Sequence, residues 1–201
     1  MTIPQFERVT VTSREEWRAW LAANHRRTES IWLVTYKKGE GRPYLPYADI
    51  VDEALCFGWI DSRPAKLDEA RTMLLLSPRR EGSAWSAVNK TKIQRLVETG
   101  RMTSAGQEKI DRAKLDGSWD RLETVDALII PDDLARALAA TPNAAARFAT
   151  FSPSSRRGIL EWILSAKRPE TRKKRIAETA SLAARNIKAN HPTGRRGEAQ
   201  S

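Results

Sequence analysis

The stretch Trp59-Ile-Asp-Ser-Arg-Pro-Ala-Lys-Leu67, followed by Arg71-Thr-Met-Leu-Leu-Leu76, decides the fold class of this chain. The short polar turn Asp68-Glu-Ala70 separates the two segments, which predicts a β-hairpin. The segment Ile31-Trp-Leu-Val-Thr-Tyr36 is rich in β-branched and aromatic residues and indicates a third strand. Apolar and polar residues alternate from Phe6 to Val11, where we expect a fourth strand. Together these segments predict a small antiparallel sheet of about four strands.

Helical patterns surround the expected strands. Ser13 and Glu16 form a capping box at the start of one helix, and apolar residues recur at helical spacing from Tyr47 to Phe57. Further helices are expected at 83–99, 104–115, 131–140, 142–149, 154–165 and 169–188, and we find no strand pattern after residue 131. The sequence therefore predicts an α+β fold, in which the small sheet is packed by helices and followed by an all-helical C-terminal part.

The same patterns divide the chain into three parts. We expect an α+β domain over residues 1–118 and a helical C-terminal region over 119–190. Residues 191–201 are small and polar, which is typical of a disordered tail.

The composition limits the classes of protein to consider. The single cysteine, Cys56, rules out an intramolecular disulfide and a cysteine-rich metal site. The longest apolar runs are too short to cross a bilayer core of roughly 30 Å, and the N-terminal residues lack the pattern of a secretory signal. We therefore expect a cytoplasmic protein with no transmembrane segment, no metal and no cofactor.

The charge points to an acidic partner. The net charge is +10 and the isoelectric point is near 10.1, which favours binding to anions such as nucleotides, nucleic acid or lipid headgroups. Residues 152–201 hold 12 basic residues against 4 glutamates, and residues 71–101 hold 7 against 2 acidic residues. The excess positive charge is thus concentrated in two places.

The first of these places contains the strongest candidate site, Ser77-Pro-Arg-Arg-Glu-Gly-Ser-Ala-Trp-Ser-Ala-Val-Asn-Lys90. It joins the end of an expected strand to the start of an expected helix, where free backbone N–H groups and the helix dipole favour an anion. Arg79 and Arg80 can add bidentate contacts to phosphate or carboxylate. Ser83 is expected at or beside the N-cap of the helix. The pattern lacks the spacing of a phosphate-binding P-loop.

The candidate ligand-binding residues extend beyond the two arginines. Ser86, Asn89 and Lys90 are spaced to share one helix face. The complete set is Arg79, Arg80, Ser83, Trp85, Ser86, Asn89, Lys90, Trp59 and Asp61. A structural interpretation stays open beside this one, in which Ser83 is only a cap, Trp85 a core residue and the arginines part of a solvated turn.

A second cluster, Cys56-Phe-Gly-Trp-Ile-Asp-Ser-Arg63, lies where a helix ends and a strand begins. Asp61 is the candidate general acid or base if the protein is an enzyme. Cys56 has no histidine near it in the sequence, so buried packing is a better interpretation than a nucleophile. His25 stands between a helix and two arginines and gives no metal-ligand pattern.

Several of these motifs resemble the bacteriocin-protection family of the YdeI/OmpD-associated (OmdA) type. The resemblance rests on Ala54–Asp61, Ser77–Lys90 and Gly100–Gly106, and on the later stretch from Ala166 to Ile176. It implies a small cytoplasmic bacterial protein associated with envelope stress and with tolerance of cationic antimicrobial peptides. It implies no catalytic mechanism, so the binding residues rest on the physical argument alone.

Three functions follow from the sequence. We favour a stress-protection protein that binds a small anionic ligand at the 77–90 turn, with an envelope-associated protein as a further partner. The alternatives are an enzyme acting on a phosphorylated or carboxylated metabolite, and a cationic protein that binds nucleic acid or a membrane surface. Glutamates interrupt the C-terminal basic run and no aromatic residues alternate with it, which disfavours nucleic acid.

Overall fold

The computed structural model describes residues 5–39 and 41–190. The chain forms two compact units, one ending at Arg121 and the other beginning at Leu122. The tail expected at 191–201 lies outside the described residues.

The N-terminal unit is built on the predicted four-stranded sheet, in the order β1-β2-β4-β3. Its first elements are β1 (Glu7–Thr10), α1 (Arg14–Asn24), β2 (Ile31–Tyr36), α2 (Tyr47–Cys56), β3 (Trp59–Lys66) and β4 (Arg71–Pro78). The β3–β4 hairpin is confirmed, and β4 also pairs antiparallel with β2. The sheet is nevertheless mixed, because β1 pairs parallel with β2. Helix α1 connects these two strands, and such a crossover returns the chain in the same direction.

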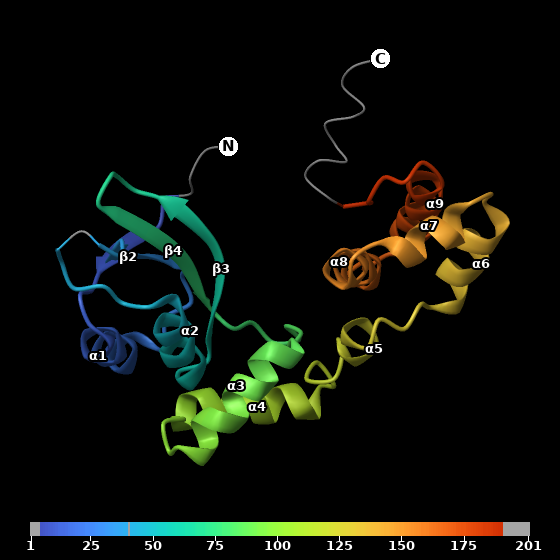
Figure 1. Cartoon of the computed structure of the whole chain (residues 1–201). Coiled ribbons are helices and arrows are strands. Elements are labelled where there is room, and N and C mark those ends of the chain that lie inside the picture. The colour runs from blue at the N-terminus through green and yellow to red at the C-terminus, as the bar shows by residue number, and fades with distance from the viewer. Residues whose placement is uncertain (1–4, 40, 191–201) are drawn as a thin grey trace. The chain divides into compact units, whose positions relative to one another are not determined.

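Helices α1 and α2 pack together and cover one face of the sheet (Figure 1). The alternation of strand side chains directs the pairs Ile31–Leu76 and Leu33–Leu74 to this face. They meet the fully buried Trp17 of α1 and other apolar residues of α1 and α2. The main core of the N-terminal unit therefore lies between the sheet and these two helices.

Two more helices complete the N-terminal unit, α3 (Ala87–Glu98) and α4 (Ser104–Leu115). Helix α4 has the bounds that the sequence predicts, whereas α3 begins four residues later than the predicted start at Ser83. The reason is tertiary: the backbone N–H of Gly82 donates to Asp116 beyond the end of α4, and Arg121 donates to the carbonyl of Gly82. These bonds hold the chain in a turn where the local pattern favours a helix.

Helices are the only regular secondary structure in residues 122–190 of the C-terminal unit, as predicted. A short helix in the expected irregular connection, α5, precedes four longer helices that pack around buried apolar residues such as Leu138, Phe148 and Ile163. Arg172 of the last helix makes two hydrogen bonds, of 2.7 and 3.0 Å, to the carboxylate of Asp133. The bounds are α5 (Glu123–Asp126), α6 (Asp132–Ala140), α7 (Ala144–Thr150), α8 (Pro153–Leu164) and α9 (Pro169–Ala184).

A fully buried carboxylate links the helices of the N-terminal unit. Glu53 of α2 accepts hydrogen bonds from Arg14 and Arg18 of α1, both at 2.6 Å, and from Arg101 just before α4. Burial alone would raise the pKa of Glu53, but the three guanidinium groups outweigh it and the pKa is lowered. Glu53 is therefore a charged residue of the core whose charge is fully compensated.

The end of α2 and the start of α4 meet through their backbones. The carbonyl of Cys56 accepts hydrogen bonds from the hydroxyl of Thr103, at 2.5 Å, and from its backbone N–H, at 3.3 Å. Gly106 of α4 lies so close that a Cβ atom there would stand 2.3 Å from the Cys56 carbonyl oxygen. Only glycine fits this position, since two of the three nearest atoms belong to the backbone of Cys56 and cannot move aside as a side chain can.

Replacing Glu53 by glutamine is expected to lower the free energy of unfolding by about 3 kcal/mol, because three partly exposed guanidinium groups lose their common carboxylate. Chemical denaturation at pH 7 measures the change. Glu69→Gln is the control, since Glu69 pairs with Lys66 at an exposed turn and should cost under about 0.5 kcal/mol. Because the folded-state pKa is lowered, the Glu53 contribution should be present above the unfolded-state pKa and be lost as pH falls through the folded-state value. Equal effects of the two substitutions would contradict this account.

Gly106→Ala is expected to destabilise the N-terminal unit by at least about 2 kcal/mol, because the added methyl group would force α4 away from α2. The matched substitution is Gly158→Ala in α8, where no atom lies within 4 Å of the added carbon. That change should be neutral or stabilise the chain by up to about 1 kcal/mol, as alanine is the better helix former. Thermal unfolding of both variants separates the two effects, and a neutral Gly106→Ala would show that the contact is unimportant.

Candidate functional site

The candidate site lies where α2, α4 and the end of β4 converge. The backbone N–H of Arg79 donates to the carbonyl of Gly58 at 2.9 Å, which fixes the end of β4 beside the end of α2. Gly58 has φ +74°, and a Cβ atom there would stand 2.6 Å from Cγ of Lys109 on α4. Glycine thus permits both the turn after α2 and the close approach of α4.

These elements enclose a cavity of about 690 Å³, which we call the outer cavity. One wall is the segment after α1, residues 25–28, and another is the segment 78–81 at the end of β4. Phe57 and the first two turns of α4, through Ser104, Ala105, Glu108 and Lys109, complete the lining. A volume of this size is typical of pockets that bind small organic molecules.

Arg79 is the most unusual residue of this lining, because it is a buried cation with 3% of its surface exposed. Its guanidinium carbon lies 3.4 Å from the ring centroid of Trp85, and Nη1 donates to the carbonyl of Ala84 at 3.2 Å. The other two nitrogens, Nε and Nη2, are buried without a hydrogen-bond partner. A cation–π contact and one hydrogen bond therefore hold the group in place while two donors stay unused.

No carboxylate forms an ion pair with Arg79 in the part of the chain that the structure describes. Burial lowers the pKa of Arg79 to about 10, and the charge of Asp61 opposes this change only in part. The lowered pKa means that holding Arg79 charged costs folding free energy at neutral pH, and that this cost is relieved as pH rises through about 10.

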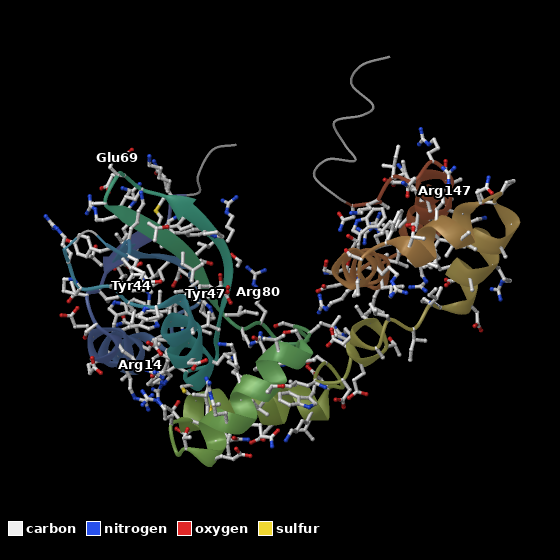
Figure 2. The ribbon with its side chains drawn as sticks, in the orientation of Figure 1. Arg14, Tyr44, Tyr47, Glu69, Arg80 and Arg147 are labelled. Carbon is white, nitrogen blue, oxygen red and sulfur yellow. The ribbon has the colours of Figure 1, made fainter. Side chains whose placement is uncertain are left out.

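Further cations surround the outer cavity. Arg26, Arg80 and Lys109 make no ion pair with any described residue. Arg27 is paired with Glu7 at 2.6 Å, and Glu81 is paired with Arg112. Figure 2 shows Arg80 where the chain leaves the sheet after β4, at the opposite end of the hairpin from Glu69. The outer cavity is thus positively charged on more than one wall.

Four of the predicted residues, Arg79, Arg80, Ser83 and Trp85, also line a small chamber of about 10 Å³. The chamber has room for about one water molecule. It shares Arg79, Arg80, Glu81 and Lys109 with the outer cavity. Ser83, which we expected at or beside the N-cap, lies three residues before the N-cap Ser86, and its hydroxyl donates to the carbonyl of Arg80 within the turn.

The remaining residues of the predicted turn lie elsewhere. Ser86 is the N-cap of α3, and its hydroxyl accepts from the backbone N–H of Asn89. Lys90 pairs with Asp120 at 2.8 Å and lies over the ring of Trp119. These three residues line neither the outer cavity nor the small chamber. The first turn of α3 therefore lies outside both cavities, whereas the first turn of α4 lines the outer cavity.

The last two predicted residues also lie outside the lining. Trp59 is fully buried in the core beside Trp20. Asp61 accepts a hydrogen bond of 2.6 Å from the hydroxyl of Tyr47. Burial, together with this bond to Asp61, raises the pKa of Tyr47 to about 12, so the hydroxyl keeps its proton. Asp61 is consequently engaged in a contact between α2 and β3.

Cys56 is a packing residue, as expected. It is completely buried. Burial, reinforced by the neighbouring charge of Glu53, raises the pKa of its thiol to about 11. A thiol of this kind carries almost no thiolate at neutral pH and is a poor nucleophile.

The sequence interpretation missed one wall of the outer cavity, residues 25–28, and the contribution of α4. His25-Arg-Arg-Thr28 directly follows an expected helix. Two adjacent arginines between a helix and a strand are the local signal that could have identified this wall. Lys109 gave no comparable signal, because its place depends on the close contact at Gly58.

Within residues 5–39 and 41–190, no cluster of three histidine, cysteine or acidic side chains is suited to hold a metal ion. The helices in those residues are all too short or too polar to span a membrane.

Two family models match separate parts of the chain. One, described as Domain of unknown function (DUF8412), matches residues 9–109, and the other, described as Bacteriocin-protection, YdeI or OmpD-Associated, matches residues 127–186. The second match confirms the resemblance over the C-terminal unit, whereas the motifs between Ala54 and Gly106 lie in the region of the first. No curated protein and no solved structure matches the chain. Since the first model covers 101 of 201 residues, the protein belongs to the family described as Domain of unknown function (DUF8412), and its C-terminal unit carries a domain of the bacteriocin-protection, YdeI or OmpD-associated type.

Proposed function

We propose that this protein binds a small anionic ligand in the outer cavity and acts in protection against bacteriocins or related peptides. The observation that carries the binding proposal is the buried guanidinium of Arg79, which has two unused donors and no acidic partner among the described residues. A buried charge without a partner costs several kcal/mol. A protein retains such a group where a ligand supplies the missing charge.

A binding protein is a better interpretation than an enzyme. For catalysis, one cavity would have to be lined by Asp61, Ser86 and Lys90. Asp61 is bonded to Tyr47, Ser86 caps α3, and Lys90 is paired with Asp120. The lining of the outer cavity contains cations and hydroxyl groups suited to binding an anion. Of its two acids, Glu81 is paired with Arg112, and Glu108 makes no ion pair with a described residue.

The protective role rests on the C-terminal domain match. We place the protein in the cytoplasm, with the N-terminal unit sensing an anionic metabolite and the C-terminal unit contacting an envelope-associated partner. The distribution of the two family matches supports this division, since the cavity lies within residues 9–109 and the bacteriocin-protection match lies within residues 127–186.

Arg79→Met is expected to weaken anion binding roughly ten- to hundredfold, because one charge-assisted contact is lost. It should leave the melting temperature unchanged or raise it, since methionine fills the space without burying a charge. Isothermal titration calorimetry with phosphate, sulfate, acetate and citrate measures binding, and differential scanning calorimetry measures stability.

The matched control is Arg71→Met at the other end of β4, where the arginine pairs with Asp68 at an exposed turn. This variant should bind anions like the unmodified protein. The proposal fails if none of the four anions binds, or if Arg79→Met folds and binds each anion as tightly as the unmodified protein does.

The protective role has its own test in a bacterial strain that lacks its own copy of this protein. Expression of the unmodified chain should raise survival under a cationic antimicrobial peptide, and the Arg71→Met variant should do the same. Arg79→Met should lose most of the protection while accumulating to the same level. Equal survival with and without the protein would refute the role.

A further inference from the structure

We propose that the ligand of the outer cavity is an organic phosphate, a molecule in which a phosphomonoester or diphosphate is attached to an uncharged body. This inference rests on the proposed function and specifies the class of anion. It follows from the balance of charge, from the geometry of Arg79 and from the size and composition of the cavity.

The charge of the cavity calls for more than one negative charge on the ligand. Four cations of the lining make no ion pair with a described residue: Arg26, Arg79, Arg80 and Lys109. Among the acids of the lining, Glu108 likewise makes no ion pair with a described residue. A single carboxylate would neutralise one of these cations. A phosphomonoester carries about −1.5 to −2 charges at pH 7 in one group, and a diphosphate carries more.

The guanidinium of Arg79 is oriented for two oxygens of one group. Its Nη1 is bonded to Ala84 and its face lies on Trp85, so Nε and Nη2 are the donors left over. These two nitrogens form one edge of the planar group, and this edge pairs with two oxygens bound to a common atom, as in phosphate or carboxylate. Neighbouring atoms cover the edge, so we expect ligand entry to shift the turn that contains Gly82, where φ is +68°.

Donors from three segments favour a tetrahedral group over a planar one. Arg26 and Thr28 come from the segment after α1, Arg80 from the end of β4, and Ser104 and Lys109 from α4. A phosphate presents three terminal oxygens in different directions and can accept from all three segments. A carboxylate presents its acceptor sites in one plane and so matches donors from three directions less well.

The cavity is larger than a phosphate needs. A water molecule occupies about 30 Å³ in the liquid, and the outer cavity measures about 690 Å³. Phe57, Pro78 and Ala105 supply an apolar part of its lining. The remaining volume therefore suits a carbon-containing body such as a sugar or nucleoside.

Isothermal titration calorimetry with matched pairs tests the proposal on the full chain. The probes are AMP against adenosine, glycerol 3-phosphate against glycerol, and succinate as a dicarboxylate of similar charge. AMP or glycerol 3-phosphate should bind at least tenfold more tightly than succinate and than the uncharged partner. ³¹P NMR should show a shifted or broadened resonance for the bound phosphate.

Two variants locate the binding. Arg79→Met should weaken binding of the phosphorylated probe roughly ten- to hundredfold, and Lys109→Gln should weaken it severalfold. Lys109 is partly exposed and makes no ion pair with a described residue, so this variant should fold even if Arg79→Met does not. The control Arg71→Met should bind like the unmodified protein.

The outcomes separate this proposal from the proposed function. Binding of succinate as tight as that of the phosphorylated probes would overturn the organic phosphate and leave an anion-binding protein. Phosphate binding that neither Arg79→Met nor Lys109→Gln weakens would overturn the assignment to this cavity. Absence of binding by every anion would overturn both proposals.

Discussion

The buried carboxylate of Glu53 is the interaction on which the N-terminal unit depends. It joins two arginines of α1 to Arg101, which lies between α3 and α4. The outer cavity is lined by the segment after α1, by Phe57 after α2 and by the first turns of α4. Glu53 therefore ties together the helices whose ends form the walls of the cavity. A change in this ion network would alter the cavity even though Glu53 does not line it.

The two most deeply buried charged side chains of the N-terminal unit differ in whether an opposite charge pairs with them. Glu53 is surrounded by three guanidinium groups, and its pKa is lowered despite burial. Arg79 pairs with no acid among residues 5–39 and 41–190, and burial lowers its pKa to about 10. The first arrangement recovers the cost of removing a charge from water, whereas the second does not. A fold that compensates Glu53 so completely could satisfy Arg79 in the same manner, and this contrast supports the proposal that a ligand pairs with Arg79.

The elements that follow local patterns could be predicted from the sequence. The hairpin of β3 and β4, the strand Ile31–Tyr36 and the helix Ser104–Leu115 all depend on apolar periodicity and on capping residues. The parallel pairing of β1 could not be predicted as easily, because it depends on where α1 returns the chain. The start of α3 was wrong for a related reason, since contacts from Asp116 and Arg121 hold residues 80–84 in a turn.

The candidate site was predictable only in part. Arg79 and Arg80 could be identified because basic residues beside a glycine-containing turn form a local signal. Phe57 and Lys109 could not, because their positions depend on glycines at 58 and 106 that allow backbones distant in sequence to approach. The need for glycine at those positions arises from tertiary contact, which no single-sequence pattern reports.

The two family matches cover different parts of the chain. The cavity and its cations lie within residues 9–109, while the bacteriocin-protection match covers residues 127–186. Neither match by itself supports both parts of the proposed function, anion binding and protection. If the charge of Arg79 is satisfied only when a ligand is bound, the N-terminal unit is more stable in the bound state, because a ligand that binds the folded form alone stabilises it in proportion to its concentration. The concentration of ligand in the cell would then set the fraction of chains in which the N-terminal unit is folded.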